Sequence, residues 1–217
     1  MENIRLKEEE IQKTLQATHI KICESFPDAS LRQTSMTILN TALEIPFTIK
    51  QITKRNYFVT ISLFLLILLV SLSLVYTWKK LNITFLGINI ADFAQMLDAS
   101  FSFLVLLGSG AYFLISYESR ARKKKLIQAI NKLIGLAHVV ESHQLSKDPD
   151  NNPYKDAKML AKYLNYCTDL LALSSKIGFL YVQALNDPEA QSIESELETL
   201  TSGISRKIWQ KIMLVQR

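Results

Sequence analysis

Two long apolar stretches constrain the fold of this chain more than any other feature. Residues Asn56–Trp78 and Ala99–Tyr117 contain no charged side chain. A bilayer core about 30 Å thick needs roughly 20 helical residues, and both stretches meet that length. A soluble helix of this length normally has a polar face, whereas these stretches contain only scattered Ser and Thr. We therefore expect two transmembrane helices; the alternative is a pair of buried core helices in a soluble bundle.

Basic residues at the ends of the stretches predict their orientation. Lys50, Lys54 and Arg55 precede the first stretch, and five of the six residues in Arg120–Lys125 are basic. Only Lys79–Lys80 lies on the other side. Since basic residues near a span stay in the cytoplasm, we expect both termini there. No apolar run precedes residue 56, so we expect a retained anchor rather than a cleaved leader.

The rest of the chain predicts helices. We expect helices over residues 2–24, from about residue 30 to 44 with Asp28 or Ser30 as N-cap, and again after Pro46. The second span continues without Pro, which predicts one helix over Ala99–Glu141, and residues 79–98 are expected to form a short outer loop or hairpin. Two further helices are predicted over 154–185 and from Asp187, where Asp187 can cap and Pro188 suits the first helical position.

Apolar periodicity predicts which side of each of these helices packs in a core. The predicted apolar positions are Ile4, Ile11, Leu15 and Ile22; Leu31, Met36, Leu39 and Leu43; Leu126, Ile130, Leu133 and Leu136; Leu160, Leu164, Cys167, Leu171, Ile177 and Leu180; and Ile193, Leu197, Leu200, Ile204, Ile208 and Ile212. The expected fold is an all-α membrane protein: N-terminal helices over 1–55, a two-span region over 56–117, and a cytoplasmic helical bundle over 118–217, with the second span continuous with a long helix of that bundle.

The composition excludes several classes of protein. Among 217 residues, 48% are hydrophobic and the formal net charge is +5, which suits a membrane protein with a basic cytoplasmic side. Cys23 and Cys167 have no metal-ligand spacing and are expected to be reduced thiols. The loop that contains Asp148, Asp150 and Asn152 lacks the Gly and the closing Glu at the spacing that an EF-hand calcium site needs. Because there is also no phosphate-binding Gly loop or nucleophile elbow, we expect no enzyme, no metal and no cofactor.

A stripe of serines marks the second span. Ser102, Ser109 and Ser116 recur every seven residues and so fall on one side of a helix. Gly108 and Gly110 keep the middle of that helix small. Two interpretations stay open: close packing of helices, or the lining of a narrow pore. Because two spans cannot enclose a water path, a pore requires a homo-oligomer.

Basic residues of the C-terminal half are candidates for binding phosphates. Lys147 lies in the loop after the long helix, and Arg206, Lys207 and Lys211 lie together on the last helix. Trp209 between them could stack on a base or could pack in the bundle. We therefore treat these five residues as candidate contacts to a nucleotide or a single-stranded oligonucleotide.

The layout of the chain resembles the SLATT class of bacterial two-span effectors. The resemblance covers an N-terminal helix, two spans with a short link, and a second span that runs into a basic helix. His138–Pro149, Tyr163–Gln183 and Leu200–Met213 are also similar to segments of bacterial proteins of this sort. The resemblance implies a Hailong-type membrane-channel effector of antiphage defence in the bacterial inner membrane. It also implies a partner nucleotidyltransferase that makes the nucleotide signal.

Two functions follow as expectations. The first is an oligomeric ion channel in the lipid bilayer, gated by a nucleotide or oligonucleotide. The second is a non-conducting, membrane-anchored helical scaffold or sensor. The first depends on the spans, the serine stripe and the resemblance, and the second needs only the spans and the helical bundle.

Overall fold

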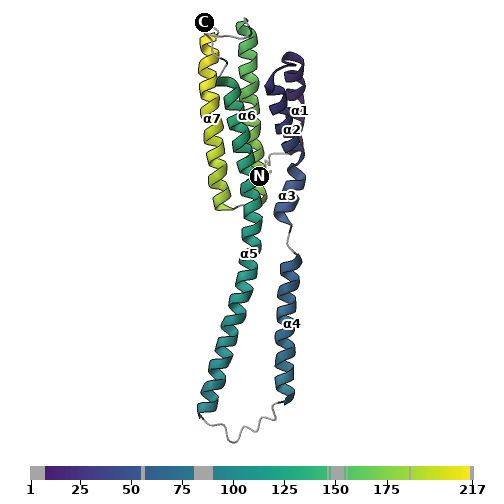
Figure 1. Cartoon of the computed structure of the whole chain (residues 1–217), viewed down its shortest axis with the longest axis vertical. Helices are drawn as coiled ribbons and strands as arrows, with labels where there is room; N and C mark the ends of the chain where they lie inside the picture. The colour runs from purple at the N-terminus through teal and green to yellow at the C-terminus, as the bar shows by residue number, and fades with distance from the viewer. Residues whose placement is uncertain are drawn as a thin grey trace, which may run out of the picture. The chain divides into compact units, whose positions relative to one another are not determined.

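The computed structural model describes residues 8–54, 57–80, 90–145, 147, 154, 156–185 and 187–215. In these ranges every regular element is an α-helix (Figure 1). The helices are α1 (Glu8–Ser25), α2 (Ser30–Leu43), α3 (Ile45–Thr53), α4 (Tyr57–Lys80), α5 (Ile90–Leu145), α6 (Ala157–Leu185) and α7 (Pro188–Val215). The expectation of an all-helical chain is therefore confirmed for these residues. The chain divides into two compact units, one made of Lys54–Ala121 and the other of Met1–Thr53 with Arg122–Arg217.

The first unit, here called the apolar unit, contains α4 and the first part of α5. Two helices are long and apolar enough to cross a membrane, within Ile45–Ser73 and Leu97–Leu145, and 6% and 0% of their most apolar windows are buried. A core helix of a soluble protein would be mostly buried, so this exposure argues against the soluble-bundle alternative. Phe64, Leu69, Leu104 and Phe113 are among the large apolar side chains left exposed.

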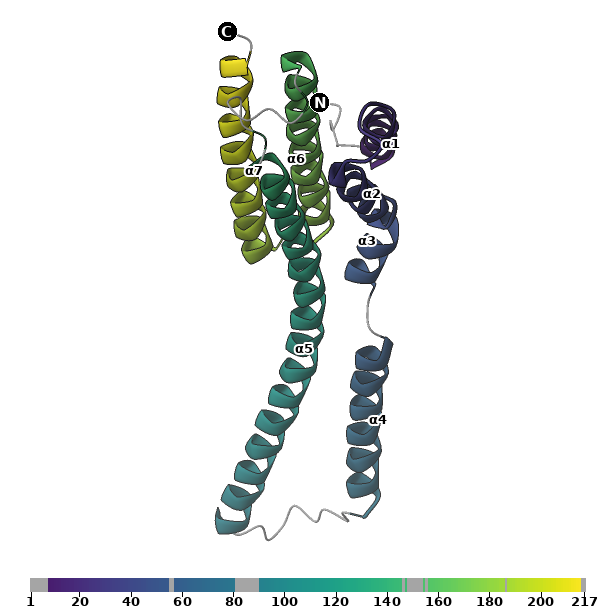
Figure 2. The same cartoon turned by 45° about the horizontal axis from the view of Figure 1, so that its top comes forward.

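The second unit, here called the helical domain, is organised around α6. This helix packs against α1, α2, α3 and α7, and Figures 1 and 2 show α6 and α7 side by side. Apolar residues recur on α6 at helical spacing, and all six of those predicted to face a core are buried. The last part of α5 adds Leu126, Ile130 and Leu133, which are also fully buried. The predicted core of the domain is confirmed at these positions.

The long helix α5 begins and ends elsewhere than predicted. It starts at Ile90 instead of Ala99 and ends at Leu145 instead of Glu141. The residues from Ile90 to Asp98 contain neither Pro nor Gly, so nothing in the backbone stops the helix there. Its far end is closed by the Lys147 N–H, which donates to the Gln144 carbonyl oxygen at 3.1 Å. The remaining part of the predicted outer link, residues 81–89, lies outside the described residues, as do Ile4, Asp148, Asp150 and Asn152.

The predicted N-cap residue is correct for α7 and wrong for α2. Asp187 caps α7 as predicted, because its Oδ1 accepts hydrogen bonds from the Glu189 and Ala190 N–H groups at 3.0 and 3.1 Å. The prediction of Asp28 or Ser30 as cap of α2 was wrong. Ala29 is the N-cap, and it makes no side-chain hydrogen bond. Helix α6 begins at Ala157 rather than at residue 154 because Asp156 Oδ1 accepts from the Lys158 N–H at 2.9 Å.

Candidate functional site

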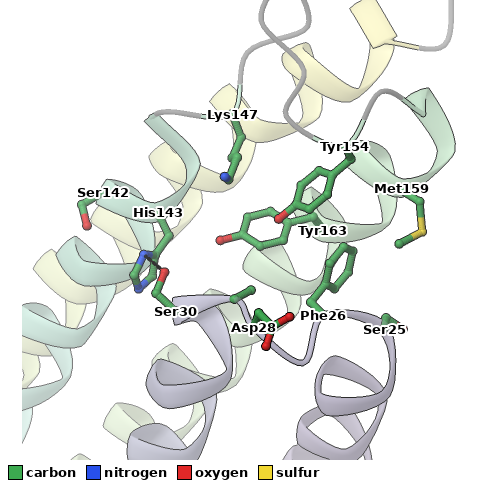
Figure 3. Close-up of a pocket in the computed structure, with 11 residues that line it drawn as sticks. Ser25, Phe26, Asp28, Ser30, Ser142, His143, Lys147, Tyr154, Met159 and Tyr163 are labelled. Carbon is green, nitrogen blue, oxygen red and sulfur yellow. Dashed lines mark hydrogen bonds between the residues drawn. The ribbon is translucent and has the colours of Figure 1, made fainter.

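A pocket of about 540 Å³ lies in the helical domain between three segments that are distant in the sequence. The turn between α1 and α2, the end of α5 and the first part of α6 supply its walls (Figure 3). Its lining residues are Ser25, Phe26, Asp28, Ala29, Ser30, Ser142, His143, Lys147, Tyr154, Met159 and Tyr163. This size falls in the range of about 300–1,000 Å³ that is typical of small-molecule sites.

Three aromatic rings form one wall of the pocket. The Phe26 ring centroid lies 5.2 Å from that of Tyr154 and 5.3 Å from that of Tyr163, and the two tyrosine rings are 5.6 Å apart. Phe26 and Tyr163 are almost fully buried, whereas Tyr154 is half-buried. The rings pack tilted or edge to face, at interplanar angles of 59°, 90° and 38°, so Tyr154 is the ring of the three with accessible area beside the opening.

Lys147 brings a positive charge to the same pocket. Its Nζ lies 5.3 Å from the Tyr154 ring centroid and 5.8 Å from that of Tyr163. These cation–π contacts hold the ammonium at the aromatic wall without neutralising it. No carboxylate among the described residues lies within ion-pair distance of it. The two contacts place the ammonium at the pocket, where an anionic group could meet it.

His143 joins α5 to α2 at the edge of the pocket. Its Nδ1 lies 3.1 Å from Ser30 Oγ, and its Nε2 lies 2.8 Å from Thr34 Oγ1. A neutral imidazole satisfies both contacts, because one ring nitrogen donates and the other accepts. Burial, and secondly the charge of Lys147, lower the pKa of His143 below its ordinary value of 6.5. These two hydrogen bonds give His143 a structural role.

One thiol and two phenols in or near the pocket have raised pKa values. Burial raises the pKa of the Cys167 thiol to about 12, and the nearby positive charge of Lys147 opposes this shift only in part. Burial also raises the pKa values of Tyr154 and Tyr163. These groups therefore stay neutral near pH 7, and the thiol is a poor nucleophile. No cluster of three or more potential metal ligands occurs in the described part of the chain.

Two of the candidate lysines on α7 turn toward α5. Lys211 Nζ donates to the Gln144 carbonyl oxygen at 3.1 Å, and Lys207 Nζ lies 3.7 Å from Glu141 Oε1. Lys211 and Lys147 thus meet at the same main-chain carbonyl, although α7 and the α5 end are far apart in sequence. Both α7 lysines are engaged in holding α7 against α5.

The other two candidates on α7 lie elsewhere. Arg206 is exposed and lines a shallow hollow with Glu198 and Gly203, while Trp209 is 53% exposed. The structure does not bring these two side chains to the pocket that contains Lys147. The three candidate serines lie on α5 in the apolar unit, where Ser102 and Ser109 are exposed and Ser116 is half-buried. Ser109 Oγ donates to its own helix, at Leu106 O, over 2.9 Å.

Sequence reasoning found Lys147 but missed the residues around it. Tyr163 falls beside Leu160 and Leu164 in the apolar pattern of α6, where an aromatic residue is usual in a core. Phe26 precedes Pro27 in a turn, which predicts a break in structure and no contact with residue 163. A run of polar, aromatic and basic residues near the loop after α5 was the one available signal. Comparison with protein-family models, curated proteins and solved structures finds no match for this chain.

Proposed function

We propose that this protein is an oligomeric, ion-conducting membrane effector of bacterial antiphage defence, controlled by a nucleotide or oligonucleotide. It would lie in the inner membrane with both termini in the cytoplasm, and a partner nucleotidyltransferase would make the signal. The membrane part of this proposal is supported by the two exposed apolar helices, and the defence part by the resemblance to SLATT-class effectors. A lipid bilayer provides the apolar surroundings that such exposed side chains need.

The observation that carries the oligomer is the unfilled space beside the small residues of α5. A Cβ added at Gly108 or Gly110 would meet no atom of the described chain within 4 Å. Small residues in a membrane helix allow another helix to approach closely, and here the described part of the same chain does not use that space. A second copy could fill it, and several copies could arrange Ser102, Ser109 and Ser116 around a path for ions.

One observation favours the second candidate function, a non-conducting membrane-anchored scaffold or sensor. The Ser109 hydroxyl is satisfied by the Leu106 carbonyl of its own helix, so it needs no water beside it. A hydroxyl that bonds within its helix can also face lipid or another helix. The serine stripe is therefore compatible with packing alone.

Planar-bilayer recording of the purified full-length chain separates the two functions. Discrete current steps whose frequency changes when nucleotides or short oligonucleotides are added would support the channel. If no current steps occur under any nucleotide condition, the channel proposal is wrong and the scaffold is favoured.

A matched pair of serine substitutions tests the pore wall. Ser71 on α4 donates to Leu68 O at 2.8 Å, the same local contact that Ser109 makes. Ser109→Leu should reduce the conductance while Ser71→Leu preserves it, with the oligomer size of both unchanged by size-exclusion chromatography. If Ser109→Leu instead breaks the oligomer, the stripe is a packing surface. An unchanged oligomer with unchanged current would remove Ser109 from the pore wall.

A further inference from the structure

The pocket at the end of α5 brings together three kinds of group. A positive charge lies at one side, an aromatic wall beside it, and a carboxylate with hydroxyls at the other edge. Figure 3 shows Lys147 and Asp28 on opposite sides of this space, with the Tyr163 hydroxyl directed toward it. All three segments belong to the helical domain. Each group limits the chemistry of a ligand that could fill the space.

The ammonium selects for a negative charge. Lys147 is held by the faces of Tyr154 and Tyr163, at 5.3 and 5.8 Å from their centroids, so little freedom would be lost when an anion binds. The neighbouring Tyr163 hydroxyl is protonated near pH 7, as any phenol is, and it lines the same pocket, where it can donate a hydrogen bond to the same anion. A phosphate, with several acceptor oxygens, suits two converging donors.

The rest of the pocket selects for a flat group that carries hydrogen-bond donors. Tyr154 is half-buried, and the exposed part of its ring is a surface of the kind on which a base stacks, while Phe26 packs behind it. Asp28 accepts hydrogen bonds and would repel a second phosphate, but it suits a sugar hydroxyl or an exocyclic amine. His143 is hydrogen-bonded to Ser30 and Thr34. It therefore forms part of the pocket edge and contributes no charge to ligand binding.

We propose that this pocket binds one nucleotide unit, with its phosphate at Lys147 and its base against the exposed part of the Tyr154 ring. This inference rests on the proposed function, in which a nucleotide is the signal. It adds the site at which that nucleotide binds. The unit is either a free mononucleotide or the phosphorylated end of a single strand. The pocket contacts one phosphate and one base, and both sources share that chemistry.

Isothermal titration of the full-length chain in nanodiscs tests the site with defined probes. The probes are AMP, adenosine, inorganic phosphate, and a trinucleotide with and without a 5′-phosphate. AMP should bind more tightly than adenosine or phosphate, because neither of these fills both parts of the pocket. Tighter binding of the phosphorylated trinucleotide than of AMP indicates the strand end, and the reverse order indicates the mononucleotide.

Substitutions assign the binding to these residues. Lys147→Gln should weaken AMP binding by about tenfold or more, since it removes a charged hydrogen bond. Tyr154→Leu should weaken it by about fivefold or more through loss of stacking. Lys147→Arg keeps the positive charge and should recover most of the affinity. Lys176→Gln, an exposed lysine of α6 outside the pocket, is the matched control and should bind as the wild type does.

The outcomes for the site and for the channel are distinguishable. Circular dichroism shows whether each variant keeps its helices, and Lys147→Arg keeps the test valid if Lys147→Gln does not fold. Equal affinity of wild type and folded Lys147→Gln, or no saturable binding of any probe, overturns the pocket even if the channel conducts. Binding that depends on Lys147 in a protein that never conducts supports the pocket and overturns the channel.

Discussion

The Lys211 ammonium donates a hydrogen bond to the main-chain carbonyl oxygen of Gln144 at 3.1 Å, which joins α7 to the end of α5. The same carbonyl accepts from the Lys147 N–H at 3.1 Å. A helix C-terminus leaves carbonyl groups without helical partners and carries partial negative charge, so a lysine there serves both needs. The Gln144 side chain is 1% exposed, and its Oε1 has no hydrogen-bond partner in the described chain.

Removal of this contact should lower stability more than removal of its exposed neighbour. Lys211→Met keeps the aliphatic stem and should cost about 1 kcal/mol, because the carbonyl loses a charged donor in a half-buried place. Lys207→Met breaks only the exposed 3.7 Å pair with Glu141 and should cost about 0–0.5 kcal/mol. Thermal unfolding followed by circular dichroism in one detergent compares the two. A larger loss in Lys207→Met contradicts the ranking.

Two glycines in helices should respond in opposite directions to alanine. A Cβ at Gly178 on α6 would lie 2.7 Å from Leu197 Cδ2 on α7, and Leu197 is fully buried. Gly178→Ala should therefore destabilise the domain by about 1 kcal/mol. A Cβ at Gly203 meets no described atom within 4 Å, so Gly203→Ala should stabilise α7 by about 0.5–1 kcal/mol. Unfolding midpoints of the two variants with the same sign would refute this pair of predictions.

Stability should fall as the pH is lowered below about 6.5, partly because of His143. Burial holds the pKa of His143 below 6.5 in the folded chain, so the unfolded chain takes up the proton first. Unfolding is then coupled to proton uptake, and stability is greatest above this pH. His19 adds to the effect, since burial and Arg32 lower its pKa too.

Unfolding midpoints at pH 7.5 and 5.5 measure this effect. His143→Gln can still exchange hydrogen bonds with Ser30 and Thr34, and it does not titrate in this range. The loss on acidification should therefore be smaller in His143→Gln, and smaller again when His19→Gln is added. An equal loss in the wild type and the double variant would show that other groups cause it.

The two thiols should react at very different rates. Cys167 is fully buried and burial raises its pKa to about 12, whereas Cys23 is half-buried with Sγ 3.5 Å from His19 Nε2. Maleimide at pH 7.5 should label one thiol in the folded protein and two in denaturant. Mass spectrometry locates the label, and Cys167→Ser should leave the folded-state rate unchanged. Equal labelling of both thiols without denaturant would contradict the buried position of Cys167.

The apolar faces show where periodicity predicts packing and where it does not. On α6 the predicted positions, from Leu160 to Leu180, are all buried. On α2 the prediction was wrong for Met36 and Leu43, which are 45% and 56% exposed, while Ile38 and Ala42 are buried instead. Helix α6 is apolar over a wide arc and is covered by several helices. A small error in the predicted direction of its apolar face therefore still selects buried positions. Helix α2 is short and less apolar, and its contacts with α1 and α6 select the buried face.

The helices and the two apolar segments can be predicted from the residues alone, because helix propensity, capping at Asp187 and span length are local properties of the chain. The pocket cannot be predicted in this way, because it forms where separate helices pack together. Phe26, Lys147 and Tyr163 come from three segments, and their meeting depends on how α1, α5 and α6 pack. Packing likewise separated Lys211, turned to the α5 carboxyl end, from the exposed Arg206 on the same helix. Residues close together in the sequence can therefore make different contacts. Which contact a side chain makes depends on the helix that packs against it, and not on its spacing along its own helix.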